Sequence, residues 1–339
     1  MSRPPVDSPG PRPAPIPPPR PVALVGPTAS GKTSLALAVA RARGAGGPPV
    51  ELVSVDSMAV YRGMDIGTAK PTAAVRSEVP YHLVDVVDPS DEYTVQQFQA
   101  AALSVLDGIA ERGHRALLVG GTGLYLRSLI DDLTFPGRFP EVATALEAEL
   151  EKAGPSDSPE GLSALAGLYA RLVDLDPVAA ARVEPTNRRR VVRALEVTMG
   201  SGRPFSSFGP GLDAYPETRF ALIGLPLARD SDRRIEDRFA AQMEAGFLDE
   251  VRELADRPGG LSRTARQALG YRELLSHLEG GVSLDAALSE AIRRTRVFAR
   301  RQWAWFRRDP RIVWVGEQED PVARVIAACA GEGSHPVGN

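Results

Sequence analysis

Short apolar runs that end in glycine or aspartate recur in the first part of the chain. Residues 22–26 (VALVG), 51–56 (ELVSVD) and 115–123 (RALLVGGTG) have the pattern of buried strands followed by turn residues. Residues 34–42 and the amphipathic stretch 94–113 instead have helical periodicity. The pattern therefore predicts strands that alternate with helices.

This alternation is typical of a doubly wound parallel sheet with helices on both faces. Ligands of such α/β folds bind at the carboxyl ends of the strands. Gly26, Asp56 and Gly120 fall at predicted strand ends. Weaker apolar runs predict further strands at residues 81–88, 219–227 and 311–315.

The pattern changes near residue 134, where helical periodicity replaces the strands. Residues 141–154, 161–173 and 187–200 are three helix candidates. Thr186 or Asn187 can cap the third helix, and Gly200 can end it. A helical segment between sheet segments indicates an insertion into the α/β core.

The domain organisation follows from these changes of pattern. Proline-rich residues 1–21 cannot bury a core, so they and the C-terminal tail should be disordered. We expect one P-loop NTPase-like core with a helical C-terminal part and one all-helical insertion domain. The predicted boundaries are 1–21 for the first tail, 22–134 and 213–330 for the core, 135–212 for the insertion and 331–339 for the second tail.

Residues 26–33 (GPTASGKT) fit the phosphate-binding P-loop pattern between a strand and a helix. Glycines let backbone amides approach phosphate oxygens, and the helix N-terminus adds a positive dipole. Lys32 should neutralise phosphate charge, and Thr33 should ligate Mg²⁺. The motif does not distinguish ATP from another diphosphate. The predicted cradle comprises Gly26, Pro27, Thr28, Ala29, Ser30, Gly31, Lys32 and Thr33.

Motifs of common P-loop enzymes are missing. No N-K-x-D or D-x-x-G constellation indicates a GTPase, and the strand at residues 115–120 has no Walker B aspartate at its end. Asp56 is the nearest carboxylate. It could receive a proton from an acceptor substrate, or it could be a helix cap or turn residue.

Composition and charge exclude several classes. The chain of 339 residues has 43% hydrophobic residues, a net charge of -3, one cysteine and four histidines. These counts rule out a disulfide framework and a cysteine zinc site, and they favour a reducing cytoplasm. No apolar run is long enough to predict a membrane span, and the N-terminus lacks the apolar region of a signal peptide.

Two stretches are rich in arginine despite the negative net charge. Arg188, Arg189, Arg190 and Arg193 cluster in the first, and residues 292–311 contain eight arginines against one aspartate. Arginines with aromatic residues suit RNA phosphates and bases. The alternative is a solvated helix face with its tryptophans in the core. The aromatic residues of the second stretch that suggest stacking are Trp303, Trp305 and Phe306.

Residues 54–71 (SVDSMAVYRGMDIGTAKP) resemble the signature of the bacterial tRNA dimethylallyltransferases, also called tRNA isopentenyltransferases. The resemblance continues in the same order to about residue 315, through VGGTGLYLRSLI, NRRRVVRALEV, RIEDRF and RQWAWFRRDPRI. It implies transfer of a dimethylallyl group from dimethylallyl diphosphate to the exocyclic amino group of adenosine 37 in tRNA. The P-loop would then hold the diphosphate of an alkylating agent.

The resemblance also implies roles for individual residues. Asp56 would take the proton of the adenine amino group, while Lys32, Arg238 and Mg²⁺ would stabilise the departing diphosphate. The helical insertion would bind the anticodon stem-loop, and we expect a cytoplasmic monomer that needs no membrane. The implied tRNA-binding residues are Asp56, Ser57, Met58, Ala59, Thr122, Arg188, Arg189 and Arg190.

The sequence departs from the family pattern at two positions. Ala59 replaces a common glutamine, which puts an adenine contact there in doubt, and Ala304 replaces a threonine. The competing hypotheses are a P-loop small-molecule kinase, an isopentenyltransferase acting on free AMP, and a non-catalytic RNA-binding protein. The insertion and the arginine-rich stretches favour tRNA, and retained Lys32, Thr33 and Asp56 favour catalysis.

Overall fold

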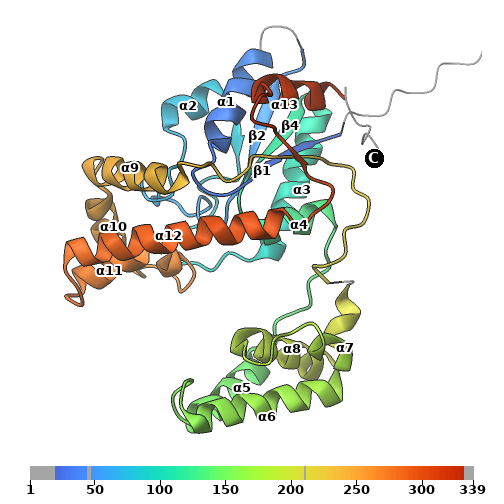
Figure 1. Cartoon of the computed structure of the whole chain (residues 1–339), viewed down its shortest axis with the longest axis vertical. Helices are drawn as coiled ribbons and strands as arrows, with labels where there is room; N and C mark the ends of the chain where they lie inside the picture. The colour runs from blue at the N-terminus through green and yellow to red at the C-terminus, as the bar shows by residue number, and fades with distance from the viewer. Residues whose placement is uncertain (1–19, 44–46, 210, 332–339) are drawn as a thin grey trace, which may run out of the picture.

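A six-stranded parallel sheet organises the chain in the computed structural model, which describes residues 20–43, 47–209 and 211–331 (Figure 1). The strand order is β3-β2-β4-β1-β5-β6, so the sheet is doubly wound as predicted. The strands are β1 (Val22–Val25), β2 (Val50–Val55), β3 (Tyr81–His82), β4 (Arg115–Gly120), β5 (Ala221–Gly224) and β6 (Val313–Trp314).

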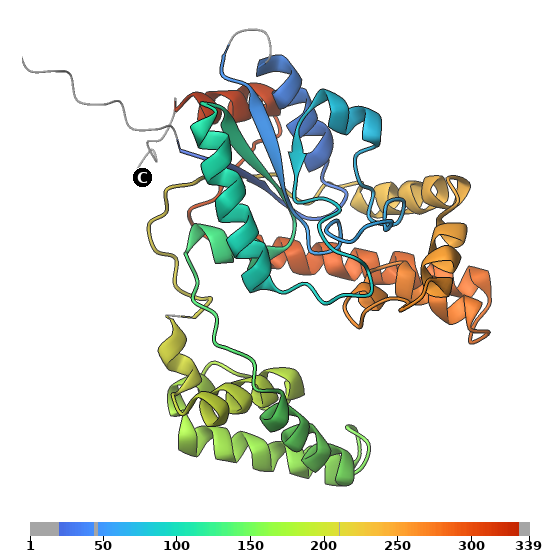
Figure 2. The same ribbon diagram turned by 180° about the vertical axis from the view of Figure 1, so that it is seen from behind.

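Helices cover both faces of the sheet, because its central strands are apolar on both sides (Figure 2). One face packs against α3 (Val95–Glu111) and α4 (Gly123–Ile130). The other face packs against α1 (Lys32–Arg43) and α13 (Pro321–Ala330). Because β1, β2 and β4 pair in parallel, their carboxyl ends meet at one edge of the sheet.

The predicted strand at residues 81–88 was wrong in length, since β3 ends at His82. Leu83 and Asp85 have φ angles of 60° and 58°, which an extended strand cannot contain. Asp85 is held there by ion pairs with Lys70 and Arg76. Tertiary ion pairs therefore override the local apolar pattern at this position.

A second helical layer adjoins the carboxyl edge of the sheet. It contains a core of its own, in which Phe247 and Tyr271 pack against the segment after β2, represented by Val60 and Met64. Two short elements complete the core: α2 (Ala73–Glu78), which lies beside α1 and pairs with it through Glu78 and Arg41, and the 3-10 helix η2 (Ala265–Gln267), which precedes α11. The layer itself comprises α9 (Ser231–Glu244), α10 (Phe247–Asp256), α11 (Tyr271–Leu278) and α12 (Leu284–Phe306).

The residues between α4 and β5 form a separate helical bundle, seen below the sheet in Figures 1 and 2. Its own core of leucine, valine and alanine joins the three longer helices. Asn187 caps α8 as predicted, but Gly200 is helical and Gly202, with φ 68°, ends the helix. The elements are α5 (Pro140–Lys152), α6 (Pro159–Leu175), α7 (Pro177–Ala180), α8 (Arg188–Ser201) and η1 (Phe205–Phe208).

The predicted tails fall mostly outside the described residues, since 1–19 and 332–339 are not described. Within the described ranges, no helix has both the length and the apolar character needed to cross a bilayer.

The loop that follows β2 is fixed to the second helical layer by backbone contacts. Glu250 accepts hydrogen bonds from the amides of residues 65–67 at 2.9, 2.7 and 3.2 Å, and from the Tyr271 hydroxyl at 2.5 Å. Gln242 donates to the carbonyls of Ile66 and Gly67. These contacts hold the loop in place. Its next residues, Thr68 to Pro71, line a cavity at the carboxyl edge of the sheet.

Gly67→Ala should lower the free energy of unfolding by about 1–3 kcal/mol, because a Cβ there would overlap the rings of Phe247 and Tyr271. Gly167→Ala is the matched control. Gly167 lies exposed inside α6 with no heavy atom near a new Cβ, so this change should stabilise by about 0.5–1 kcal/mol. Denaturant unfolding of both variants checks the opposite signs, and an unchanged Gly67→Ala protein would contradict the packing.

Candidate active site

A cavity of about 250 Å³ opens at the carboxyl ends of β1, β2 and β4. Its walls come from the P-loop, the end of β2, the loop that Glu250 fixes, and the helices α9 and α12. Five of the eight predicted cradle residues line it, and so do both predicted catalytic partners. These residues are Thr28, Ala29, Gly31, Lys32, Thr33, Asp56 and Arg238.

The P-loop takes its shape from residues behind the cavity wall. A Cβ on Gly26 would lie 2.5 Å from the backbone oxygen of Leu225, so only glycine fits beside β5. Gly31 has φ 90° and directly precedes α1, which begins at Lys32. The first amides of a helix have no intrahelical acceptor, so the start of α1 offers donors to an anion.

Two cations from distant parts of the chain meet at this cradle. Lys32 Nζ donates to the Pro27 carbonyl at 2.5 Å and to the Ser30 hydroxyl at 3.3 Å. Arg238, on α9, donates from a terminal nitrogen to the Thr28 hydroxyl at 2.9 Å. The Arg238 Nε atom is buried and has no hydrogen-bond partner among the described residues. An unpartnered buried cationic group is suited to an anionic ligand.

The pKa of Lys32 is lowered to about 7, chiefly by burial; nearby Asp56 opposes the change and Arg238 adds to it. Burial also lowers the pKa of Arg238, again opposed by Asp56. Arg238 thus disfavours the charged form of Lys32, so the two groups repel each other when both are charged. A bound anion would relieve that repulsion.

Asp56 is a turn residue that also lines the cavity. Its Oδ1 accepts from the backbone amides of Met58 at 2.8 Å and Ala59 at 3.4 Å, so it is a turn residue. The same side chain lines the cavity opposite the cations. Ser57 donates its backbone amide to the Thr122 hydroxyl at 3.2 Å, which ties the turn to the end of β4.

Gln302 on α12 joins the P-loop to the β4 end. Its Oε1 accepts from the Thr28 amide at 2.8 Å, and its Nε2 donates to the Gly121 carbonyl at 2.8 Å. Sequence reasoning did not single out this residue. Its only signal was a polar position on the buried face of a helix, which indicates a partnered side chain.

The arginines of α8 divide into paired and unpaired groups. Arg188 forms an ion pair with Glu147, and Arg193 pairs with Glu196 and donates to the carbonyls of residues 136 and 137. Arg189 and Arg190 are exposed and form no side-chain ion pair within the described chain. Arg188 therefore holds the bundle together, whereas its two neighbours face solvent.

The arginines of α12 divide in the same way. Those in its first two-thirds mostly pair with carboxylates: Arg293 with Glu290, Arg294 with Glu273, and Arg296 and Arg300 with residues of α9. Arg311, after the helix, pairs with Asp131 and Asp309. In residues 292–311, the exposed arginines without an ion pair to a described residue are Arg301, on α12, and Arg307 and Arg308, just after it.

Of the three aromatics predicted to stack, Phe306 was wrong because it is buried, whereas Trp303 and Trp305 are half-buried against other side chains. Phe306 is buried, Trp305 packs on the sheet core, and Trp303 meets Trp314 edge to face. Phe298 is instead the exposed aromatic of α12, and it lines the cavity. It was missed because the apolar pattern alone does not separate it from core residues.

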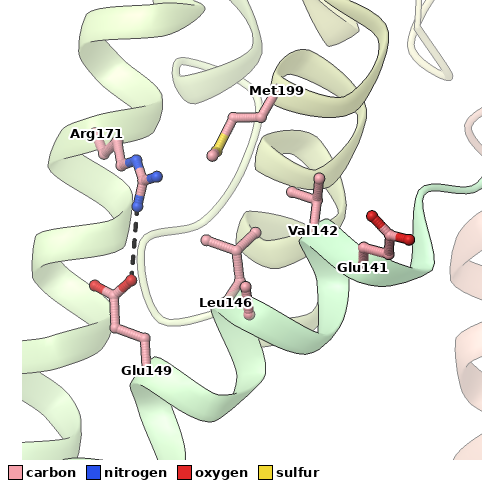
Figure 3. Close-up of a pocket in the computed structure, with 7 residues that line it drawn as sticks. Glu141, Val142, Leu146, Glu149, Arg171 and Met199 are labelled. Atoms are coloured by element: carbon pink, nitrogen blue, oxygen red, sulfur yellow. Dashed lines mark ion pairs between the residues drawn. The ribbon is translucent and has the colours of Figure 1, made fainter.

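A second, apolar pocket lies in the helical bundle (Figure 3). Val142, Leu146 and Met199 supply its apolar wall, and Glu149 pairs with Arg171 at 3.6 Å beside it. Carboxylates at its margin disfavour a phosphate ligand. The chemistry therefore belongs to the cavity at the sheet edge.

A parallel α/β sheet with a P-loop, two half-buried cations and an adjacent carboxylate is typical of enzymes whose substrates carry phosphate. Residues 59–309 match the family model described as IPP transferase. The chain belongs to this family of prenyl-group transferases.

Relatives cover most of the chain. A tRNA dimethylallyltransferase of Bifidobacterium longum (strain NCC 2705) is 44% identical over 298 residues, which span 86% of this chain and 85% of the relative. A tRNA dimethylallyltransferase of Acidothermus cellulolyticus is 45% identical over 313 residues, or 91% of this chain and 92% of the relative.

Solved structures have the same fold. The tRNA isopentenylpyrophosphate transferase of Bacillus halodurans aligns with a TM-score of 0.63 and 35% identity, covering 92% of this chain and 96% of that one. A eukaryotic dimethylallyltransferase acting on tRNA aligns with a TM-score of 0.69 over 91% of this chain and 78% of that one. At 23% identity, the second likeness concerns the fold alone.

Binding of dimethylallyl diphosphate at pH 8 should take up close to one proton, because Lys32 has a pKa of about 7 and is mostly neutral before an anion arrives. Affinity from this group should therefore weaken as the pH rises above about 7. Calorimetry in buffers of different ionisation enthalpy measures the uptake. Lys32→Arg is the matched control, since arginine stays protonated, and equal uptake by both proteins would contradict the assignment.

Proposed function

We propose that this protein transfers the dimethylallyl group of dimethylallyl diphosphate to the exocyclic amino group of an adenosine beside the anticodon of tRNA. The observation that carries this is the meeting of Asp56 with Lys32 and Arg238 in one cavity. The cations suit a diphosphate, and the carboxylate suits a proton acceptor. The tRNA dimethylallyltransferases similar to most of this chain support the same substrate pair.

The cationic side of the cavity assists departure of the leaving group. As the bond between the allylic carbon and the bridging oxygen breaks, negative charge builds on the diphosphate. Lys32, Arg238 and the amides at the start of α1 stabilise that charge. Thr28 orients Arg238 through the hydrogen bond between its hydroxyl and the guanidinium.

The residues of the cradle also fit Mg²⁺. Among the described residues there is no group of three carboxylate, histidine or cysteine side chains that could hold a metal alone. Mg²⁺ usually binds through one or two protein oxygens together with substrate phosphates. Thr33 lines the cavity and would supply one of those oxygens. Bound Mg²⁺ would add further stabilisation of the leaving diphosphate.

Asp56 acts on the other substrate. The adenine amino nitrogen attacks the allylic carbon and supplies the new bond, while the electrons of the broken bond leave with the diphosphate. The proton lost from nitrogen passes to the Asp56 carboxylate. The hydrogen bonds that the carboxylate accepts from the backbone amides of Met58 and Ala59 fix its position for that transfer. The products are the dimethylallylated adenosine and diphosphate.

The helical bundle and α12 would bind the RNA. Figure 1 shows α12 along the edge of the upper body that faces the α5–α8 bundle. Arg189 and Arg190 would contact phosphates on one side, and the unpaired arginines of α12 on the other. Ser57 and Thr122, which are joined by a hydrogen bond near the carboxyl ends of β2 and β4, would also contact the RNA. We expect a cytoplasmic monomer.

Transfer of label from dimethylallyl diphosphate to unmodified tRNA, but not to AMP, tests the function. Asp56→Asn should slow single-turnover transfer by about 10²–10⁴-fold, because it removes the proton acceptor. Diphosphate affinity should stay nearly unchanged. Asp88→Asn, a turn carboxylate bonded to Ser90, is the control. Transfer by Asp56→Asn within about threefold of wild type would sink this role. Efficient labelling of AMP, or ATP turnover with a small acceptor, would overturn the function.

Replacement of Arg189 and Arg190 by Gln should weaken tRNA binding and flatten the dependence of log affinity on log salt. Each lost phosphate contact should reduce that slope by about 0.7–0.9. Arg188→Gln should instead lower the melting temperature, because Arg188 pairs with Glu147. Arg293→Gln, exposed and paired with Glu290, is the matched control. An unchanged slope in the folded double variant would refute an RNA contact on α8.

A further inference from the structure

Phe298 is the exposed aromatic side chain of this protein. All ten phenylalanines, seven tyrosines and three tryptophans lie in the described ranges, and the others are buried or half-buried. Phe298 is 41% exposed and lines the cavity beside Asp56 and Arg238. A large apolar ring at the mouth of a polar cavity indicates a ligand contact rather than core packing.

The position of Phe298 on α12 is fixed from below. It lies four residues before Gln302, so both side chains share one helical face. Gln302 is hydrogen-bonded to the P-loop and to Gly121. These bonds fix this face of α12, and with it the position of Phe298 at the cavity. Arg301 lies three residues after Phe298, so the two side chains are neighbours on the helix surface. It is exposed and has no ion pair among the described residues.

We propose that Phe298 stacks on the adenine that receives the dimethylallyl group, after that base has left the anticodon loop. This inference rests on the proposed function. A base must leave its stack to reach a cavity of this kind, and aromatic side chains replace the lost stacking. Arg301 then binds the phosphate beside the flipped nucleotide.

The dimethylallyl chain fits Phe298 less well. That chain is covalently bonded to the diphosphate and therefore stays close to Lys32 and Arg238. Phe298 is partly in solvent, on the same helix as the exposed Arg301. Ala59, next to the Asp56 turn, has no side-chain hydrogen bond to offer the base. Stacking supplies orientation that Ala59 does not.

The test compares Phe298→Leu, which keeps apolar bulk, with Phe298→Tyr, which keeps an aromatic face. Phe298→Leu should raise KM for tRNA, or lower the single-turnover rate, by roughly 5- to 150-fold. Phe298→Tyr should stay within about threefold of wild type, and so should the exposed control Val282→Ala. Affinity for dimethylallyl diphosphate alone should not change in any variant.

A second readout reports stacking directly. An anticodon stem-loop with 2-aminopurine at the target position should fluoresce more brightly on Phe298→Leu than on wild type or Phe298→Tyr, since an unstacked base is not quenched. Equal brightness and equal transfer by the Leu and Tyr variants would overturn stacking. A loss of diphosphate affinity with normal tRNA kinetics would overturn it in favour of a prenyl contact. If wild-type protein labels no tRNA, the proposed function itself fails.

Discussion

The amide of Gln302 is the contact on which the geometry of the cavity depends. It accepts a hydrogen bond from the P-loop and donates one to the end of β4, although it belongs to a helix far along the chain. An amide satisfies a donor and an acceptor at once, which neither a carboxylate nor an ammonium group can do. Together with Trp305 and Phe306, which pack on the sheet core, this side chain holds α12 in register with the sheet. The positions of Phe298 and the unpaired arginines follow from that register.

A second constraint is the confinement of like charge. Lys32 and Arg238 come from distant parts of the chain and share one cavity, and both burial and Arg238 disfavour the charged form of Lys32. Only the interaction with Asp56 offsets this before an anion binds. A bound diphosphate would reverse these unfavourable electrostatics, and in the proposed reaction its charge grows as the allylic bond breaks. The same cations would be less useful if buried carboxylates already neutralised them.

Much of the fold was predictable because it depends on local patterns. The strands, the P-loop and the capped helix α8 follow from periodicity, glycine spacing and Asn187. The predictions were wrong where contacts with residues distant in the sequence determine the local structure. The strand at Tyr81 stops early because Lys70 and Arg76 hold Asp85, and the expected stacking residue Phe306 is buried in the core. The individual roles of the site residues stay predictions, since a sequence pattern does not show which atoms of the substrates each residue contacts.

The distinction between paired and unpaired arginines resolves the conflict between local basic stretches and a net charge of -3. Most arginines of α12 satisfy carboxylates on neighbouring helices, as Arg296 does with Glu236 and Arg294 with Glu273. Those pairs fix the helical layer and leave little charge for RNA. A solvated, unpaired guanidinium is the one that exchanges a counterion for a phosphate. Affinity for RNA should therefore depend on a few positions, such as Arg189 and Arg301, and the count of basic residues overstates the binding surface.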